Sequence, residues 1–372
     1  MFLEKITLKG NKLRIHIYII SIAVIFIGAI LLFNYVQKAN RFKLLDDVTI
    51  TNTLDESISS NTYWCGALNI AWQEFVKMHV NQDLGFTSQS DKLTALNSYY
   101  FPEDSMAASY TLSGIKSLEL KNKLESDIYE KYEEVCGILG SVKWPSAKTD
   151  NVNNYLIYSR LNKKFEFETK FSDLGKSSFG EVNNLTDNVK YFGIDENTSE
   201  SVYSQVQVLY YNSETDYAIK LITTSGDDII LCVGEINTSL GEIYQNILTS
   251  SEIYLGNKNF VKGDTLKIPY ISFSRKVNYA SLQNLKFINK NNEESILTDV
   301  WQTVEFKIDN SVFNPQKIED DISYETSKIM LANEGEENRK FCFNNTFAIY
   351  IKESSKEMPY FAAYIEDISK FN

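Results

Sequence analysis

The chain has 372 residues, of which 43% are hydrophobic and 13% aromatic, enough to build the core of one large domain or two modest ones. The formal net charge is −12 and basic residues occur only in short mixed runs, which excludes the clustered positive charge of a nucleic-acid-binding surface. The abundance of Lys, Asn, Ile and Tyr is typical of AT-rich bacterial genomes and indicates a bacterial source.

The first predicted element is a membrane-spanning helix. Residues 15–36 contain no Asp, Glu, Lys or Arg, and a spanning helix needs about 20 such residues. A cleaved signal peptide is the alternative, but its apolar region is usually about 7–15 residues long and ends at a small-residue cleavage site. Basic residues before the run favour a cytoplasmic N-terminus. We predict a cytoplasmic tail over 1–14, a signal anchor over 15–36, a juxtamembrane segment over 37–60 and an extracytoplasmic domain over 61–372.

The predicted domain opens with a helix that carries the second of the two histidines. Apolar residues within 63–80 share one helical face with this histidine: Cys65, Leu68, Trp72, Phe75, Val76 and His79. The pattern predicts that His79 lies at the edge of the core. A zinc site rich in histidine is excluded, and a Ser-His-Asp or Cys-His arrangement could use only His79 outside the apolar run.

No motif in the sequence indicates a cofactor. The four cysteines are widely spaced, without a C-x-x-C pair, which favours buried free thiols, although an extracytoplasmic location permits disulfides. Phosphate-binding, dinucleotide-binding and nucleophile-elbow motifs do not occur. Carboxylates are adjacent at Asp227–Asp228 and Asp320–Asp321, and paired acids could serve a hydrolase of the cell wall or of glycans. We predict no cofactor, no metal and no catalysis, with this hydrolase as an alternative.

Two further helices are predicted. Ser239 and Glu242 form a capping box at the start of one of them. Residues 118–139 predict the other, since apolar residues at helical spacing share one face: Leu120, Leu124, Ile128, Val135 and Ile138.

The second half of the chain predicts strands. Alternating or apolar runs occur at 154–161, 164–171, 204–211, 216–223, 227–233, 264–273 and 300–309, and the chain ends in a hairpin of 346–351 and 360–365. Helices therefore dominate early and antiparallel sheets late. This order predicts an α+β fold in one large domain that follows the transmembrane helix.

The segment 309–340 is long, charged and weakly periodic, although it lies between a strand and the closing hairpin. Structureless loops of more than about 12–15 residues are usually functional or disordered. We therefore predict an exposed loop here.

Several stretches, taken in order, resemble the serpin family over residues 61–372. QTVEFKID is similar to the strand that leads into the serpin reactive loop, and FCFNNTFAIYIKE with PYFAAYIEDI looks like the last two strands. LKIPYISF resembles the strand that usually reads L-P-K-F, and NTYWCGALNIAWQEF resembles the opening helix. NYLIYSRLNKKFEFETKF resembles the region of N-A-x-Y-F-K-G-x-W. The chain departs from the family at Tyr158-Ser159, Phe165 and Thr346, which replace Asn-Ala, Trp and Pro, and it lacks F-S-P-x-S-I.

The resemblance implies a serpin-like fold, and the loop decides its function. Inhibitory serpins trap a protease by inserting the reactive loop as a new strand, which needs a hinge of small residues. Here the hinge contains Phe313, Lys317 and Ile318, which are bulky, and Pro315, which lacks the N–H of a central strand.

The leading hypothesis is therefore a membrane-anchored, extracytoplasmic binding module without catalysis, whose partner is a protein or a protease. A working protease inhibitor of the same fold is the first alternative. The candidate interaction residues of the loop are Phe313, Lys317, Glu319, Asp320, Asp321, Tyr324 and Lys328.

Overall fold

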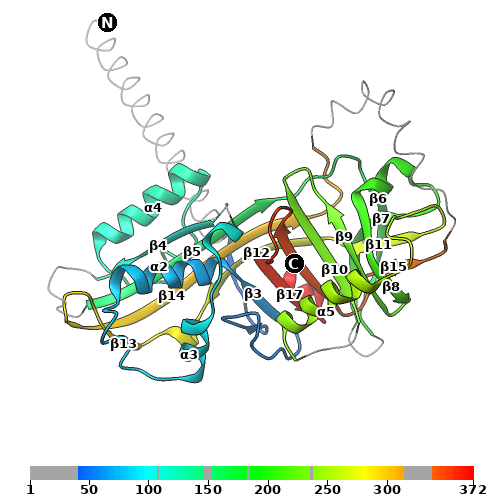
Figure 1. Cartoon of the computed structure of the whole chain (residues 1–372). Coiled ribbons are helices and arrows are strands. Elements are labelled where there is room, and N and C mark those ends of the chain that lie inside the picture. Colours follow the sequence, from blue (N-terminus) through cyan, green and yellow to red (C-terminus); the bar gives the residue numbers. More distant parts are fainter. Residues whose placement is uncertain (1–40, 107–108, 146–152, 182–184, 235–237, 314–336) are drawn as a thin grey trace, which may run out of the picture.

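The computed structural model describes residues 41–106, 109–145, 153–181, 185–234, 238–313 and 337–372 of the chain. In these ranges the chain forms three β-sheets, named here A, B and C, and α-helices that pack on them (Figure 1). Three of the α-helices in these ranges precede residue 133, and most of the strands follow it. The α+β arrangement with helices early and sheets late is therefore present.

Sheet A has the strand order β1-β12-β14-β5-β4, and β13 pairs with the first part of β14. Its strands are β1 (Lys43–Leu44), β4 (Ser109–Ile115), β5 (Asn153–Lys164), β12 (Ile271–Asn278), β13 (Leu285–Ile288) and β14 (Glu294–Ile308). The two longest strands, β5 and β14, run parallel at the centre and pair from Asn153–Ser295 to Lys164–Lys307, with a register shift of one residue between Leu297 and Asp299. Because side chains alternate along a strand, Val304 and Phe306 of β14 reach the main core while Thr303 and Glu305 face the other side.

Sheet B has the order β2-β3-β17-β16-β10-β9-β8. Its strands are β2 (Thr49–Ile50), β3 (Thr62–Cys65), β8 (Val206–Ser213), β9 (Asp216–Ile222), β10 (Asp227–Val233), β16 (Phe347–Glu353) and β17 (Phe361–Ile365). The predicted meander is confirmed as β8, β9 and β10, and the closing hairpin as β16 and β17. The hairpin lies inside the sheet, between β10 and β3, and β17 is buried along its whole length, which explains why the sequence ends on apolar runs.

Sheet C has the order β15-β11-β7-β6. Its strands are β6 (Ser172–Phe179), β7 (Thr186–Ile194), β11 (Thr265–Pro269) and β15 (Lys340–Cys342). The single strand predicted at 264–273 is wrong, because the chain passes from β11 in sheet C to β12 in sheet A within two residues. The loop predicted at 309–340 therefore connects β14 of sheet A to β15 of sheet C.

The helices are α2 (Ala67–His79), α3 (Asp91–Ser98), α4 (Leu118–Tyr132) and α5 (Leu240–Ile253), with 3₁₀ turns η1 (Glu103–Ser105), η2 (Glu200–Gln205), η3 (Ala280–Leu282) and η6 (Ile368–Phe371). The cap of α5 is confirmed, since Ser239 Oγ accepts the Glu242 N–H at 3.1 Å. Helix α4 is shorter than predicted, because Glu133 adopts a left-handed conformation with φ 55° and ends it. Val135 and Ile138 consequently lie beyond the helix.

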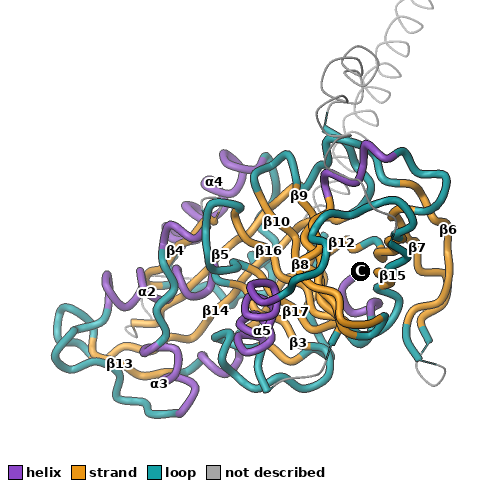
Figure 2. The backbone as a smooth tube through the Cα atoms, turned by 45° about the vertical axis from the view of Figure 1, so that its right-hand side comes forward, coloured by secondary structure: helices purple, strands orange, loops and turns teal. Residues whose placement is uncertain are grey.

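Sheet A separates two apolar clusters. Its inner face contributes to the main core, which also contains the buried residues of sheets B and C. Its outer face packs with α4 in a smaller cluster that includes Leu124, Ile128, Tyr158 and Trp301. Figure 1 shows α4 on one side of sheet A and α2 and α3 on the other, and Figure 2 shows α5 beside sheet B.

The prediction of a transmembrane helix as part of this fold was wrong. None of the helices in the described ranges is long and apolar enough to cross a membrane. The predicted span, 15–36, lies outside the described residues. The membrane anchor and the extracytoplasmic location that depended on it are therefore withdrawn. Residues 41–60, predicted as a juxtamembrane segment, supply β1 and β2 and bury Phe42, Leu45 and Leu54.

Candidate functional site

The predicted interaction loop leaves sheet A beside the chain that follows β5. Phe167 donates its N–H to the Ser311 carbonyl at 3.0 Å, and Phe313 donates its N–H to the Phe167 carbonyl at 2.9 Å. These bonds form a parallel bridge between Phe167 and Val312, so the β5–β14 pairing continues past the ends of both strands. The strand predicted at 164–171 was wrong, since residues 165–171 contribute only this bridge to strand pairing.

Asp309 fastens the first residues of the loop. Its carboxylate is buried, accepts the Ser311 N–H at 2.9 Å and pairs with Lys307. Burial alone would raise the pKa of Asp309, but the hydrogen bonds from Lys307 and Ser311 outweigh it and hold the pKa below its ordinary value. The loop thus departs from sheet A at a charged, hydrogen-bonded turn.

Arg339 fastens the other end of the loop, immediately before β15. This side chain is buried and donates to both carboxylate oxygens of Asp264, at 3.2 and 2.7 Å. It also donates to the carbonyls of Asn257 and Asn259, at 2.5 and 2.7 Å. A buried arginine in a bidentate pair holds a fixed geometry, so both ends of the loop are anchored to the folded body.

We call the line along which β5 and β14 pair the seam. A buried polar cluster bridges the seam on its inner face. Gln302 of β14 donates its Nε2–H to Ser159 Oγ of β5 at 3.0 Å, directly across the ladder. Its Oε1 accepts hydroxyl hydrogens from Tyr279, at 3.0 Å, and from Tyr63 of sheet B. All four side chains are buried, so their polar atoms depend on one another rather than on water.

An ion network covers the outer face of the same seam. Arg160 of β5 is fully buried, pairs with Glu134 and lies 3.6 Å from Glu305 of β14. Arg41 pairs with the same two carboxylates. The Arg160 guanidinium also lies over the Tyr132 ring, 4.3 Å from its centroid. The N-terminal end of the described chain is thereby attached to the seam.

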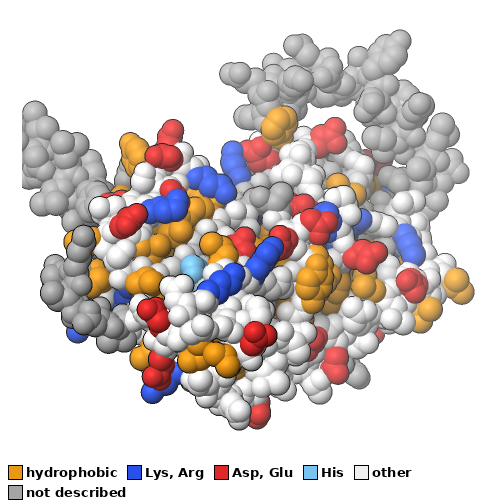
Figure 3. Space-filling model, turned by 60° about the vertical axis from the view of Figure 1, so that its left-hand side comes forward, with side chains coloured by type: hydrophobic (Ala, Val, Ile, Leu, Met, Phe, Trp, Pro, Cys, Tyr) orange, Lys and Arg blue, Asp and Glu red, His pale blue; other side chains and the backbone are white. Residues whose placement is uncertain are grey.

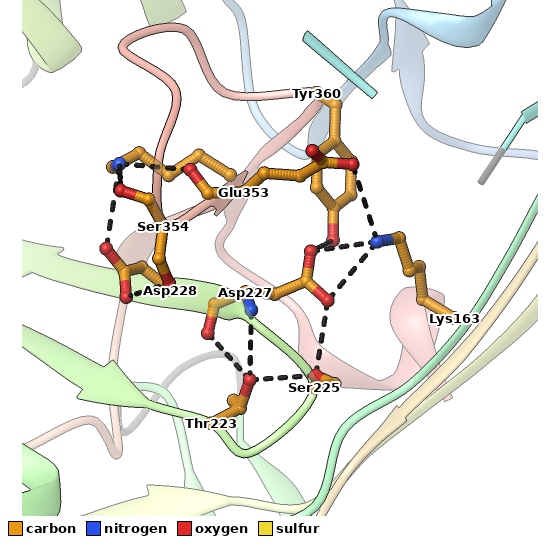
Figure 4. A network of polar contacts seen from close by, with 9 residues as sticks. Lys163, Thr223, Ser225, Asp227, Asp228, Glu353, Ser354 and Tyr360 are labelled. Atoms are coloured by element: carbon orange, nitrogen blue, oxygen red, sulfur yellow. Dashed lines mark hydrogen bonds and ion pairs between the residues drawn. The ribbon is translucent and has the colours of Figure 1, made fainter. Parts of the chain in front are cut away.

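A third network joins the end of β5 to sheet B (Figure 4). Lys163 pairs with Asp227 of β10 at 2.9 and 3.2 Å. Tyr360 donates its hydroxyl to the same carboxylate at 2.9 Å, and Ser225 donates to it at 3.2 Å. Burial and the neighbouring Asp227 charge raise the pKa of Tyr360 well above its ordinary value, so the phenol remains a donor.

The adjacent carboxylates considered for a hydrolase do not converge on a groove. Asp227 is only 1% exposed and is occupied by the contacts just described. Asp228 is buried as well, accepts from Ser354 at 2.8 Å and lies 3.6 Å from Lys352. Asp320–Asp321 lies outside the described residues. Since a general acid or nucleophile must reach a substrate, the described pair functions as structural ion-pair partners.

The predicted interaction residues fall mostly outside the described ranges. Phe313 is described, and 58% of it is exposed. Outside the described ranges lie Lys317, Glu319, Asp320, Asp321, Tyr324 and Lys328. Sequence reasoning missed Arg160, Gln302 and Arg339, because a single buried polar residue has no local pattern and is recognised only by its distant partners.

His79 lies at the end of α2, half-buried against aromatic rings. Its ring centroid lies 5.3 Å from that of Tyr155 and 5.6 Å from that of Phe75, and its Nε2 lies 3.1 Å from Ser113 Oγ. Burial lowers its pKa from the ordinary value. The four cysteines are free thiols, and no group of His, Cys, Asp and Glu in the described ranges could hold a metal ion.

Comparison with solved structures shows a distant resemblance to serpins. SRPN18 from Anopheles gambiae matches with a TM-score of 0.52 and 12% identity over 85% of this chain and 94% of that chain. Mouse protein-Z dependent protease inhibitor matches with a TM-score of 0.50 and 12% identity, over 83% and 91%. Thyroxine-binding globulin in complex with thyroxine matches with a TM-score of 0.50 and 10% identity, over 82% and 92%. No family model and no curated protein sequence matches.

These matches confirm the predicted resemblance at the level of the fold. The prediction of a bacterial source is withdrawn, because nothing in the comparisons points to bacteria. At these identities the likeness concerns the fold alone, and function has to be argued from this chain's own residues.

Proposed function

We propose that this protein is a non-inhibitory, serpin-like binding module that presents residues 309–340 to a partner protein. Protease inhibition would require the first part of this segment to insert as a new strand between β5 and β14. The composition of that part is the observation that supports the proposal. The inner face of the seam is part of the main apolar core, and α4 covers the outer face. An inserted strand would therefore have to bury both of its faces.

Neither register of an inserted strand suits that environment. Because side chains alternate, one register turns Lys317, Glu319 and Asp321 toward the core, and the other turns Asp320 toward it. A buried, unpaired charge is strongly unfavourable. Pro315 also lacks the N–H that one ladder position would require. Insertion is therefore unfavourable in free energy, because the loop carries charged residues and the inserted strand would face the main apolar core.

The composition of the loop indicates the kind of partner. Between residues 314 and 336 there are six carboxylates and two lysines. An acidic segment held at both ends, by Asp309 and by Arg339, is suited to a basic surface, with Phe313 and Tyr324 as apolar contacts. The interaction residues proposed for the loop are thus the charged and aromatic residues named from the sequence.

Limited proteolysis of the full chain tests the non-inhibitory assignment. We expect serine proteases to cut within the loop, to dissociate as active enzymes, and to change the melting temperature of the chain by no more than about 2 °C, because the cut removes few buried contacts. A variant with Phe313, Pro315, Lys317 and Glu319 replaced by Ala serves as the comparison. An adduct of wild-type chain and protease that survives a denaturing gel, or a sharp rise in melting temperature after cleavage, would overturn the proposal.

A further inference from the structure

Strand β4 forms one edge of sheet A, and its backbone is organised for a further partner. Lys116 donates its N–H to the Asn154 carbonyl at 2.7 Å, which identifies the hydrogen-bonded pairs of the antiparallel β4–β5 ladder. Hydrogen-bonded pairs alternate along the ladder, so the even-numbered residues of β4 direct their N–H and C=O groups toward β5. Ser109, Thr111, Ser113 and Ile115 therefore direct their N–H and C=O groups away from the sheet.

Few described groups bond to this outward row. Lys131 Nζ reaches the Ser109 carbonyl at 3.1 Å, and His79 lies against the backbone of Ser113. In the described ranges the remaining outward backbone groups, including both of Thr111, have no hydrogen-bond partner. A carbonyl oxygen has two lone pairs, so the two occupied carbonyls can still accept from another strand.

Other edge strands in the described part of the chain have features that disfavour pairing with a further strand. Strand β8 is covered, because Val208 donates its N–H to the Lys258 carbonyl at 2.9 Å. Strand β6 contains charged side chains and register shifts around Gly175. Strands β1, β2 and β15 have only two or three residues. By contrast β4, SYTLSGI, has seven residues without a charge, a proline or a bulge.

Charged side chains of the neighbouring helices contact β4, since Glu74 of α2 accepts the Thr111 hydroxyl and Asp127 of α4 accepts the Tyr110 hydroxyl, but the strand itself carries no charge. Exposed apolar side chains occur on β4 and on the two helices that contact it, with Met78 of α2 56% exposed, Ile115 46% and Leu118 of α4 52%. Figure 3 shows this side of the molecule, where hydrophobic side chains lie among Lys, Arg, Asp and Glu side chains. A partner that approaches this edge meets no charge on the strand itself, which permits contact between two chains that each carry −12.

We propose that β4 pairs with β4 of a second copy of this chain, antiparallel about a twofold axis at Leu112, so that the two A sheets become continuous. In this register Ser109 is opposite Ile115 and Thr111 is opposite Ser113, so that each outward backbone group acquires a partner. Leu112 faces its own counterpart and Tyr110 is opposite Gly114, so no two bulky side chains other than the leucines meet directly. The strand is thus complementary to itself in one register.

A cysteine scan of the full chain tests this register. Residues in a non-hydrogen-bonded antiparallel pair have Cα atoms about 4.5 Å apart, a distance that a disulfide can span. Leu112→Cys is therefore expected to form a covalent dimer under mild oxidation. Tyr110→Cys, two residues away on the same face, should not, because its counterpart lies four residues along the partner strand. Wild type, with its four native cysteines, is the background control.

A second pair of variants tests the backbone pairing. Thr111→Pro removes an N–H that points away from the sheet, which an edge strand tolerates. Thr111→Val keeps that N–H and also loses the hydroxyl bond to Glu74, so it controls for the side chain. In sedimentation experiments we expect dimers for wild type and Thr111→Val, favoured by added salt, and monomers for Thr111→Pro. Monomeric wild type, or equal crosslinking of Cys variants at 110 and 112, would overturn the proposal.

Discussion

The central strand β5 has two neighbours that are fastened in different ways. Its pairing with β14 is parallel and is bridged by side chains on both faces, by Gln302 with Ser159 and by the Tyr158 hydroxyl, 2.5 Å from Thr303 Oγ1. Its pairing with β4 leaves an outward row of backbone groups beyond it. Side chains therefore hold β5 and β14 together on both faces of the sheet, whereas no further described strand pairs with β4 at the edge.

This difference indicates which of two changes in sheet A costs less free energy, the separation of β5 from β14 or the addition of a strand beside β4. Separation of β5 from β14 would leave buried polar atoms without partners, and each such group costs about 1–3 kcal/mol. Addition of a strand to β4 breaks no ladder and supplies partners to backbone groups that have none in the described ranges. If sheet A gains a strand, we expect the strand to come from a second chain at the edge and not from the loop at the seam.

The largest effect is expected at the end of β5, where the seam joins sheet B. Lys163→Met leaves the buried Asp227 carboxylate without its cation, and loss of one partner of a buried ion pair costs about 3–5 kcal/mol. Lys164→Met is the matched control, because this neighbouring lysine is 80% exposed and its loss should change the unfolding free energy by no more than about 0.5 kcal/mol. Equal effects in urea denaturation would show that the Asp227 network does not fasten the seam.

The next effect concerns the centre of the seam. Gln302→Leu removes the amide that three buried side chains share, and we expect a loss of about 2–3 kcal/mol in unfolding free energy. Ser159→Ala removes only one of these bonds and should cost about 1 kcal/mol. Neither substitution should alter the dimerisation expected at β4. A Gln302→Leu chain as stable as wild type would mean that apolar packing alone holds the two strands together.

The sequence predicted the elements whose signal is local. The N-cap at Ser239, the meander of β8 to β10 and the closing hairpin all follow from patterns within a few residues. Strand β4 was missed, because its serines, threonine and glycine resemble a turn and only its pairing with β5 makes it a strand. The split between β11 and β12 was missed for the same reason, since apolar periodicity does not report which sheet a strand joins.

The loop could be located from the sequence, but its anchors could not. The charge and weak periodicity of 309–340 distinguish it from the strands on either side. The fastening of its C-terminal end depends on Arg339 reaching Asp264, 75 residues earlier in the chain. Contacts of this kind arise from topology, so they become visible only when sheets A and C are assembled.

The smallest expected effect lies at the open edge, where His79 packs below β4. Burial lowers its pKa below the ordinary 6.5, so on acidification the unfolded chain takes up a proton before the folded chain does. The contribution of His79 to stability is therefore complete above about pH 6.5 and is lost as the pH falls through the folded-state pKa. His79→Leu should abolish this part of the pH dependence and leave the fold intact, since a half-buried helix position tolerates an apolar side chain. The measurement is the unfolding free energy of both chains between about pH 5.5 and 7.5. His79 is the one histidine in the described ranges, so a pH slope that persists in the variant would assign the titration to another group.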